Sequence, residues 1–229
     1  MKKFLFVFLI SCFSLTISTC SVNWGSNKDD TTSGLFVSVG NSGTIIISSD
    51  GITWIFSTSG TSSNLWGINY GNSTFVTVGD SGTILTSSDG TSWDNRTSDV
   101  SSTLYGVTYG NSTFVTVGDN GTILTSSDGT TWTSRTSNTS KNLYGVIYGN
   151  STFVTMGGSG TILTSSDGTS WTSRTSGASD TLWGVIYGKS AYVVVVGTLG
   201  TVLTSSDLTT WTSRTSNTSN NLLEVTYKE

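Results

Sequence analysis

The chain has 229 residues, of which 10 are Lys or Arg and 14 are Asp or Glu, so its formal net charge is -4. A weakly acidic chain with only 10% charged residues has no basic surface for nucleic acid, and we expect no such partner. Aromatic residues make up 11%, which excludes the aromatic-poor composition of disordered chains. The chain has no His, the most common general base and metal ligand, so we expect no metal and no cofactor.

The chain begins "MKKFLFVFLISCFSLTISTC", in which two lysines precede an apolar run from Phe4 to about Ile17. This run is short for a membrane span and is typical of an export signal. Both cysteines of the chain, Cys12 and Cys20, lie in this segment. The remaining residues therefore cannot form a disulfide framework.

Cys20 follows the apolar run and precedes small polar residues, which resembles the end of a bacterial lipoprotein signal. Thr19 departs from the small residue that usually precedes the lipidated Cys, and Cys12 in "LISC" fits better but leaves a very short apolar run. A plain secretory signal is the alternative. We expect a lipoprotein-like signal peptide at residues 1–20 with lipid on Cys20, a flexible tether at 21–33 and a folded domain at 34–229. The protein would then be exported to a bacterial cell envelope, either lipid-anchored or secreted.

A seven-residue motif occurs five times, as "SSDGITW", "SSDGTSW", "SSDGTTW", "SSDGTSW" and "SSDLTTW". Its Asp and Trp recur together at Asp50 and Trp54, Asp89 and Trp93, Asp128 and Trp132, Asp167 and Trp171, and Asp207 and Trp211. Successive Asp residues are 39, 39, 39 and 40 positions apart. A period of this length is typical of solenoids, propellers and repeat arrays.

Each repeat predicts four short strands. In the unit from Leu104 to Asn142, four apolar runs cover residues 104–109, 113–117, 122–125 and 131–136, and none shows helical periodicity. Gly110-Asn111 and Asp119-Asn120 are hairpin turn signals between the first three runs, and the Asp motif makes the third turn. Each unit is therefore predicted to be a four-stranded antiparallel meander.

The second run, "TFVTV", is apolar on both faces, which favours a sheet packed between two similar sheets. A ring of such sheets is a β-propeller. Residues 35–40 match a second strand and residues 222–229 match a first strand, so the C-terminal strand is expected to join the N-terminal three and close the ring. We therefore predict an all-β, five-bladed propeller of four-stranded blades, with a β-solenoid as the alternative.

The stretch "TILTSSDGTTW" resembles the Asp-box, or BNR, repeat, although here Asp and Trp are one residue closer together than in the family pattern. That repeat occurs in sialidases, sortilin-type receptors and photosystem II assembly-factor propellers, and this chain resembles the assembly-factor type and exported bacterial BNR-like propellers. The resemblance covers residues 35–229 and implies a structural role for the motif, at the hairpin before the outermost strand. An Asp that starts a turn can accept hydrogen bonds from N–H groups two or three residues on. The alternative, a ring of carboxylates that binds cations, requires the Asp residues to lie closer together than a propeller rim allows.

The sequence does not predict an enzyme. A sialidase-like site needs converging Arg side chains, whereas Arg96, Arg135, Arg174 and Arg214 all occupy one slot of the repeat, on the outermost strand. Glu224 stands in the innermost-strand slot that other units fill with Gly, and a lone carboxylate lacks the partner that acid–base hydrolysis requires. We expect no catalytic residues, with glycoside hydrolysis as a minor alternative.

The predicted function is binding. The loops between outer and inner strands and the second turns vary most between repeats, and both should open on one face. The candidate ligand-binding residues are Trp66, Tyr105, Tyr144, Trp183, Asp80, Asp119, Lys141 and Glu224. Aromatic rings among small polar residues suit proteins or sugars, although such rings also simply pack between blades. We expect a monomeric, non-catalytic, membrane-tethered scaffold that binds a protein, and the alternative is a lectin with repeated sites.

Overall fold

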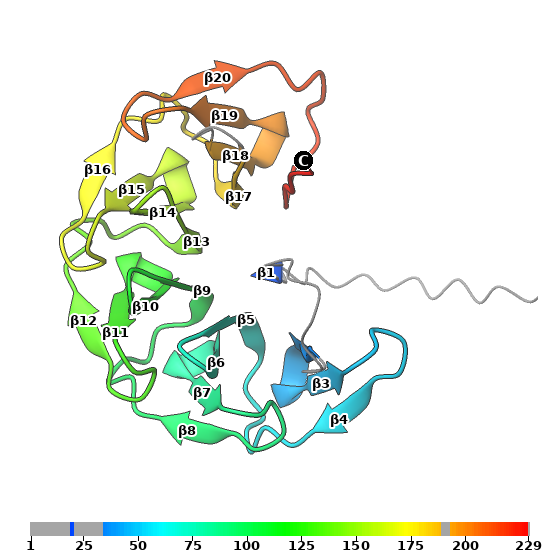
Figure 1. Ribbon diagram of the computed structural model, residues 1–229. Helices are drawn as coiled ribbons and strands as arrows, with labels where there is room; N and C mark the ends of the chain where they lie inside the picture. The colour runs from blue at the N-terminus through cyan, green and yellow to red at the C-terminus, as the bar shows by residue number, and fades with distance from the viewer. Residues whose placement is uncertain (1–18, 21–33, 189–192, 229) are drawn as a thin grey trace, which may run out of the picture.

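A computed structural model of the chain describes residues 19–20, 34–188 and 193–228. Residues 1–18 of the predicted signal peptide (1–20) and the predicted tether at 21–33 lie outside the described residues. The described chain forms five β-sheets that follow one another around a central axis, like the blades of a propeller (Figure 1). This arrangement confirms the predicted five-bladed β-propeller.

The blades follow the chain in order. The N-terminal blade contains β2 (Phe36–Val39), β3 (Ile45–Ser48) and β4 (Ile55–Ser57). The second and third blades are β5 (Leu65–Gly71), β6 (Thr74–Gly79), β7 (Ile84–Ser87) and β8 (Asp94–Arg96), then β9 (Leu104–Gly110), β10 (Thr113–Gly118), β11 (Ile123–Ser126) and β12 (Thr133–Arg135). The last two are β13 (Leu143–Gly149), β14 (Thr152–Gly157), β15 (Ile162–Ser165) and β16 (Thr172–Arg174), then β17 (Leu182–Tyr187), β18 (Val193–Gly197), β19 (Val202–Ser205) and β20 (Thr212–Arg214).

Two turn types connect the strands of a blade. Between β9 and β10, Asn111 and Ser112 have φ values of 46° and 56°, as a two-residue type I′ hairpin turn requires. Between β10 and β11 the chain makes a 3-10 turn, η3 (Asp119–Gly121), in which Asn120 is left-handed with φ 55°. The equivalent turns in the other blades are η1 (Asn41–Gly43), η2 (Asp80–Gly82), η4 (Gly158–Gly160) and η6 (Thr198–Gly200).

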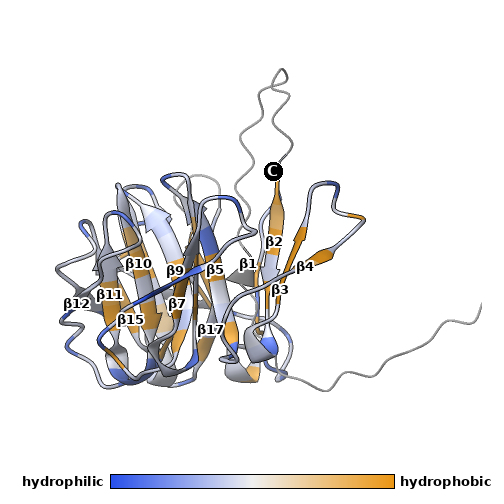
Figure 2. Cartoon of the chain, turned by 90° about the horizontal axis from the view of Figure 1, so that it is seen from below, coloured by the Kyte–Doolittle hydropathy of each residue, from blue (hydrophilic) through white to orange (hydrophobic). Residues whose placement is uncertain are grey.

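The hydrophobic core lies between neighbouring blades. One cluster joins Val76 and Val78 of β6 to Leu104 of β9, Phe114 of β10 and Trp132 beyond β11. Similar clusters follow at the next two junctions. The middle strands are apolar on both faces because each sheet packs against a sheet on either side, as the stacked blades in Figure 2 show.

The predicted closing strand is not formed. The sheet β2-β3-β4 has three strands, and residues 221–228 belong to no strand. The segment that begins at Leu222 still lies where an inner strand would begin, because the Leu222 N–H donates to the Gly197 carbonyl at 2.9 Å. A Cβ added to Gly184 would lie 2.9 Å from the Glu224 Cα, a contact like that between Gly106 and Gly145 of neighbouring inner strands, so the segment lies against β17 although it forms no strand with β2. The predicted pairing of the C-terminal strand with β2 is therefore wrong, whereas the predicted number of five blades is correct.

The second blade contains one strand more than the predicted four. Two residues, β1 (Thr19–Cys20), pair in parallel with β5 and make a five-stranded sheet, with Thr19 opposite Gly67 and Cys20 opposite Ile68. The inner edge of β5 faces the axis and offers unpaired backbone groups, which a passing segment can satisfy. The described residues contain no helix that is both long and apolar enough to cross a membrane.

Candidate functional site

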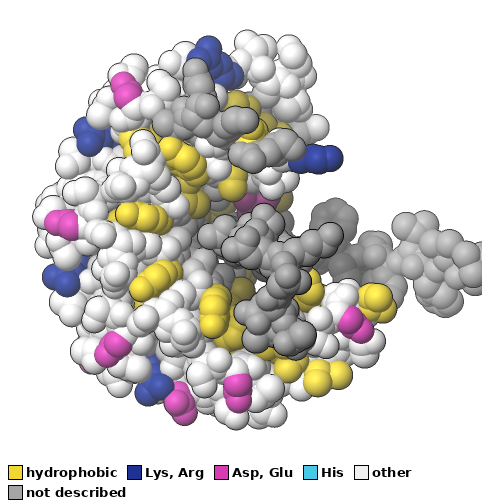
Figure 3. All heavy atoms as spheres, viewed as in Figure 1, with side chains coloured by type: hydrophobic (Ala, Val, Ile, Leu, Met, Phe, Trp, Pro, Cys, Tyr) yellow, Lys and Arg dark blue, Asp and Glu magenta, His cyan; other side chains and the backbone are white. Residues whose placement is uncertain are grey.

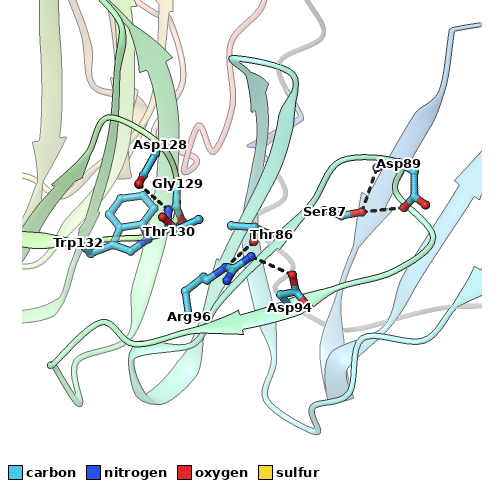
Figure 4. A network of polar contacts seen from close by, with 9 residues as sticks. All are labelled: Thr86, Ser87, Asp89, Asp94, Arg96, Asp128, Gly129, Thr130 and Trp132. Carbon is cyan, nitrogen blue, oxygen red and sulfur yellow. Dashed lines mark hydrogen bonds and ion pairs between the residues drawn. The ribbon is translucent and has the colours of Figure 1, made fainter.

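The Asp motif forms a turn, here called the Asp turn, that begins at Ser-Ser-Asp after the third strand of each blade. Asp128 Oδ1 accepts hydrogen bonds from the Thr130 N–H at 2.8 Å, the Thr131 N–H at 3.0 Å and the Ser126 hydroxyl at 2.9 Å. Figure 4 shows this turn beside its neighbour. The other four blades repeat these bonds at Asp50, Asp89, Asp167 and Asp207. One carboxylate oxygen of each motif is thereby occupied within its own turn.

The Trp of the motif fixes the turn against the preceding blade. Trp132 donates its indole N–H to the Gly129 carbonyl at 2.9 Å, and a Cβ on Gly129 would contact Val76 and Thr86 of the preceding blade. Trp171 makes the same bond. In the last blade Leu208 replaces this Gly, and the buried Trp211 indole nitrogen has no hydrogen-bond partner in the described structure.

These hydrogen bonds stabilise the ionised carboxylates. The N–H groups of Thr53 and Ile52 and the Ser48 hydroxyl lower the pKa of Asp50 to about 2. The pKa values of the other four Asp residues are lowered still further by equivalent bonds, at Asp89, Asp128, Asp167 and Asp207. The hydrogen bonds of each carboxylate stabilise its own turn, and the five carboxylates lie one on each blade.

The four Arg residues lie at the rim, on the outermost strands β8, β12, β16 and β20 (Figure 1). Arg135 Nε donates to the hydroxyl of Thr125 on the adjacent strand at 2.8 Å, and Arg96, Arg174 and Arg214 repeat this bond. Arg96 also forms an ion pair with Asp94 at 2.8 Å (Figure 4). Because one Arg lies on each blade, the structure does not bring them together.

The variable loops and the second turns do share one face, here called the loop face. Asn64, which ends the first loop, accepts the Asp80 N–H at its backbone carbonyl (2.9 Å) and the Ser42 N–H at its side-chain oxygen (2.9 Å). One loop residue thus joins the second turns of two blades. Asn142 and Asn221 accept the N–H groups of Asn120 and Leu199 in the same way.

Four aromatic side chains at the starts of the inner strands form an aromatic arc on the loop-face side of the propeller: Trp66, Tyr105, Tyr144 and Trp183. Successive ring centroids lie 6.1, 5.2 and 4.4 Å apart, with interplanar angles of 59°, 52° and 36°. All four side chains are partly buried. The arc therefore brings together residues from four blades that are separated by 39 positions in the sequence.

One half of the arc is held by carboxylates. The Trp66 indole N–H donates to Asp80 Oδ1 at 2.6 Å, and the Asn64 amide donates to Asp80 Oδ2 at 2.9 Å. The Tyr105 hydroxyl donates to Asp119 Oδ1 at 3.0 Å. Burial and this bond to Asp119 both raise the pKa of Tyr105, so the hydroxyl stays protonated. The two Asp candidates and two of the aromatic candidates are thus one polar cluster.

The other half of the arc lacks these carboxylates, because Gly158 and Thr198 occupy the Asp positions of the last two blades. The buried indole nitrogen of Trp183 has no hydrogen-bond partner in the described structure. Two exposed apolar side chains occupy neighbouring positions of the repeat. Leu199, in the second turn of the last blade, is 66% exposed, and Leu223, at the position equivalent to Trp66, is 45% exposed. Sequence reasoning missed both, although each departs from the residue types in its slot.

Lys141 and Glu224 lie apart from the polar cluster. Lys141 is exposed in the loop before β13, where its N–H donates to the Thr139 hydroxyl at 3.1 Å. Glu224 lies beside Gly184 at the inner strand of the last blade, and desolvation raises its pKa. Within the described ranges, no group of three or more Cys, Asp or Glu side chains is placed to hold a metal ion.

Comparison with known proteins shows the fold alone. No family model and no curated protein matches the sequence. Among solved structures, YCF48 bound to D1 peptide has a TM-score of 0.62 at 19% identity, over 79% of this chain and 63% of that one. YCF48 from Cyanidioschyzon merolae has a TM-score of 0.63 at 16% identity, over 82% and 72% of the two chains.

An ancestral GH74 enzyme has a TM-score of 0.58 at 13% identity, over 80% of this chain and 31% of the enzyme. The chain thus spans less than two thirds of the YCF48 chain solved with the peptide, and about a third of the enzyme. Identities this low establish that the chain has a β-propeller fold and do not establish an activity.

Proposed function

We propose that the chain is a non-catalytic, exported β-propeller scaffold that binds an extended segment of a protein partner across its loop face. The observation that carries this proposal is the aromatic arc, which has carboxylates bonded to Trp66 and Tyr105 and lacks them at Tyr144 and Trp183. A surface of this kind suits a peptide, whose backbone and side chains alternate between polar and apolar groups. YCF48, which shares the fold, has been solved with a peptide bound.

A lectin is the second candidate, because aromatic rings beside carboxylates also suit sugars. A sugar needs an open ring face, however, and each ring of the arc has a neighbouring ring within 4.4–6.1 Å. This packing favours a protein segment that contacts ring edges. A glycan array separates the two candidates: binding that a monosaccharide inhibits would support the lectin and contradict the scaffold.

The test of the binding face compares two triple variants. The loop variant is Asp80→Asn/Asp119→Asn/Lys141→Gln, and the rim variant is Arg96→Gln/Arg135→Gln/Arg174→Gln. The partner is first captured from the native envelope fraction with the parent chain, and its affinity for both variants is then measured. We expect the loop variant to lose about tenfold in affinity, or ~1.4 kcal/mol, and the rim variant to change little. With melting curves as the control, loss of binding in the rim variant alone would contradict the proposal.

Export and anchoring are part of the same proposal and rest on the sequence before residue 21; cleavage before Cys20 would remove Thr19, so the pairing of β1 with β5 belongs to the uncleaved chain. Cys20→Ser should move the protein from the membrane fraction to the soluble exported fraction, because a lipid chain supplies the membrane affinity. The measurement is fractionation together with mass spectrometry of Cys20. An unmodified Cys20 and unchanged fractionation would contradict a lipid anchor on this residue.

A further inference from the structure

The outer edge of the N-terminal blade carries an exposed apolar patch, here called the β4 patch. It consists of Ile52, Ile55 and Phe56, which are 84%, 59% and 83% exposed. Figure 2 shows β4 as a hydrophobic strand at the free end of the stacked sheets. Figure 3 shows hydrophobic side chains at the N-terminal blade, while the rest of the rim is mainly polar or charged.

The patch is a departure from the repeat. In the other four blades the position of Ile52 holds Thr, and the positions of Ile55 and Phe56 hold Thr or Asp and Ser or Asn. The equivalent residues are Thr91, Asp94 and Asn95; Thr130, Thr133 and Ser134; Thr169, Thr172 and Ser173; and Thr209, Thr212 and Ser213. Only the N-terminal blade replaces all three polar residues with large apolar ones.

Closure of the ring would not cover these side chains. Trp54 is 40% exposed, whereas Trp132 and Trp171, which have a blade on the preceding side, are 7% exposed. Closure would therefore bury Trp54. The positions of the β4 patch are different, because their equivalents are exposed even in the blades that have neighbours on both sides. The three apolar side chains face outward by position, and the described residues leave them uncovered.

The backbone of β4 is open on the same side. Among the described strands β4 pairs with β3 alone, so within this part of the chain its outer edge offers unpaired N–H and C=O groups. Outer strands of natural sheets are usually protected by charged side chains, and β8, β12, β16 and β20 each carry an Arg. In β4 this Arg is replaced by Ser57, whose hydroxyl donates to the Gly90 carbonyl of the next blade at 3.0 Å. β4 is therefore a short, uncharged and apolar edge.

We propose that the β4 patch binds a second copy of this chain, with the two β4 strands pairing antiparallel about a two-fold axis. A two-fold interface brings each residue close to its own copy, so a strand that pairs with itself must not bring like charges together. β4 carries no charge at residues 55–57, whereas each of the other four outer strands would place an Arg from each copy one position from such an axis. The pairing would place Phe56 opposite Phe56 of the second copy and would leave both loop faces free.

The charges around the patch argue against a lipid surface as the occupant. Residues 50–57 contain the ionised Asp50 and no Lys or Arg, whereas a membrane-binding surface normally adds basic residues to its apolar ones. A patch without charge complementarity also gives little specificity for a foreign protein. The proposed dimer replaces the monomer expected from the sequence, and it does not depend on the proposed function of the loop face.

Cysteine cross-linking of the full chain in the cells that express it tests the pairing. Phe56→Cys places a thiol at the two-fold axis, and Ser134→Cys places one in the same slot of β12 as a matched control. We expect at least about tenfold more disulfide-linked dimer for Phe56→Cys, because the interface raises the local thiol concentration. Both variants retain Cys12 and Cys20, so these cysteines contribute the same background to each.

A second variant separates interface from chance contact. The variant Ile52→Thr/Ile55→Thr is made in the Phe56→Cys chain. It introduces the Thr residues that other blades have at these positions, so the fold should be kept while the excess of cross-linked dimer is abolished. Sedimentation of the parent chain should give a dimer and that of Ile52→Thr/Ile55→Thr/Phe56→Ser a monomer. A monomeric parent, or equal cross-linking at Phe56→Cys and Ser134→Cys, would overturn the proposal, and flotation of a monomeric parent with vesicles would assign the patch to lipid.

Discussion

The backbone N–H of Leu222 donates to the carbonyl of Gly197 at 2.9 Å, as the N–H of Leu65 donates to the carbonyl of Gly40 at 3.0 Å. Both bonds join the start of one inner strand to the end of the second strand in the preceding blade. The C-terminal segment thus enters the position of a first strand, although it forms no ladder with β2. The last residues of the chain are therefore part of the propeller.

Deletion of residues 222–228 should destabilise the protein. The deletion removes the segment that lies beside Gly184 and leaves the inner face of the last blade exposed. We expect a loss of about 2 kcal/mol or more in unfolding free energy, or a fall of roughly 4–8 °C in Tm, measured by thermal unfolding. A truncation that removes only the exposed residues after Thr226 is the control, and an equal Tm for both truncations would contradict this role.

Asp128→Ala should cost about 1 kcal/mol of stability, because it removes the acceptor of two backbone N–H groups in the way that loss of a helix cap does. The measurement is the free energy of unfolding in urea. Ligand affinity should be unchanged in the folded variant, since Asp128 bonds only within its own turn. If binding is lost while stability is retained, the Asp turn has a direct role in recognition.

The five Asp turns should make stability depend on acid pH. Each folded-state pKa is lowered below the ordinary value, and that of Asp50 falls from 3.8 to about 2. A lowered pKa stabilises the fold above the unfolded-state pKa, and this stabilisation disappears as the pH falls through the folded-state pKa. The unfolding free energy should therefore decrease from about pH 5 to about pH 2, each exposed carboxylate contributing little alone.

Urea unfolding at several pH values measures this dependence. Asp128→Asn removes one titrating group and should make the decrease shallower. A free energy of unfolding that is the same at pH 5 and pH 2 would mean that these carboxylates are bound no better in the folded chain than in the unfolded one.

Much of the fold follows from the sequence because the repeat supplies the same information five times. The apolar run at residues 104–109 becomes β9 (Leu104–Gly110), and Asn111 makes the expected tight turn because Asn tolerates a positive φ. The shared loop face was also predictable, since the turns alternate between the two ends of a meander.

Individual side-chain contacts and close backbone approaches could not be predicted in this way. The bond from Trp66 to Asp80 depends on side-chain rotamers at two separate strand ends, which no periodicity encodes. The position of residues 222–228 depends on close approach to the backbone at Gly184. The exposure of Phe56 requires knowledge that its slot faces outward, which only the packed blades provide.

Leu199→Asn should raise the stability of the protein. Leu199 has φ 53°, a left-handed conformation that is unfavourable for a bulky residue, and the other blades place Ser or Asn at this position of the second turn. Its side chain is 66% exposed, so little burial is lost on replacement. We expect a gain of about 1 kcal/mol, or roughly 2–4 °C in Tm, measured by thermal unfolding.

Leu199→Ala is the control that separates strain from contact, because Ala keeps the unfavourable backbone but removes most of the apolar side chain. If Leu199 belongs to the apolar half of the binding face, both variants should bind the partner several times more weakly, while only Leu199→Asn becomes more stable. Retention of a strained, exposed Leu would then reflect binding, since strained residues persist where function requires them. Unchanged affinity in both variants would limit the binding face to the aromatic arc and its two carboxylates.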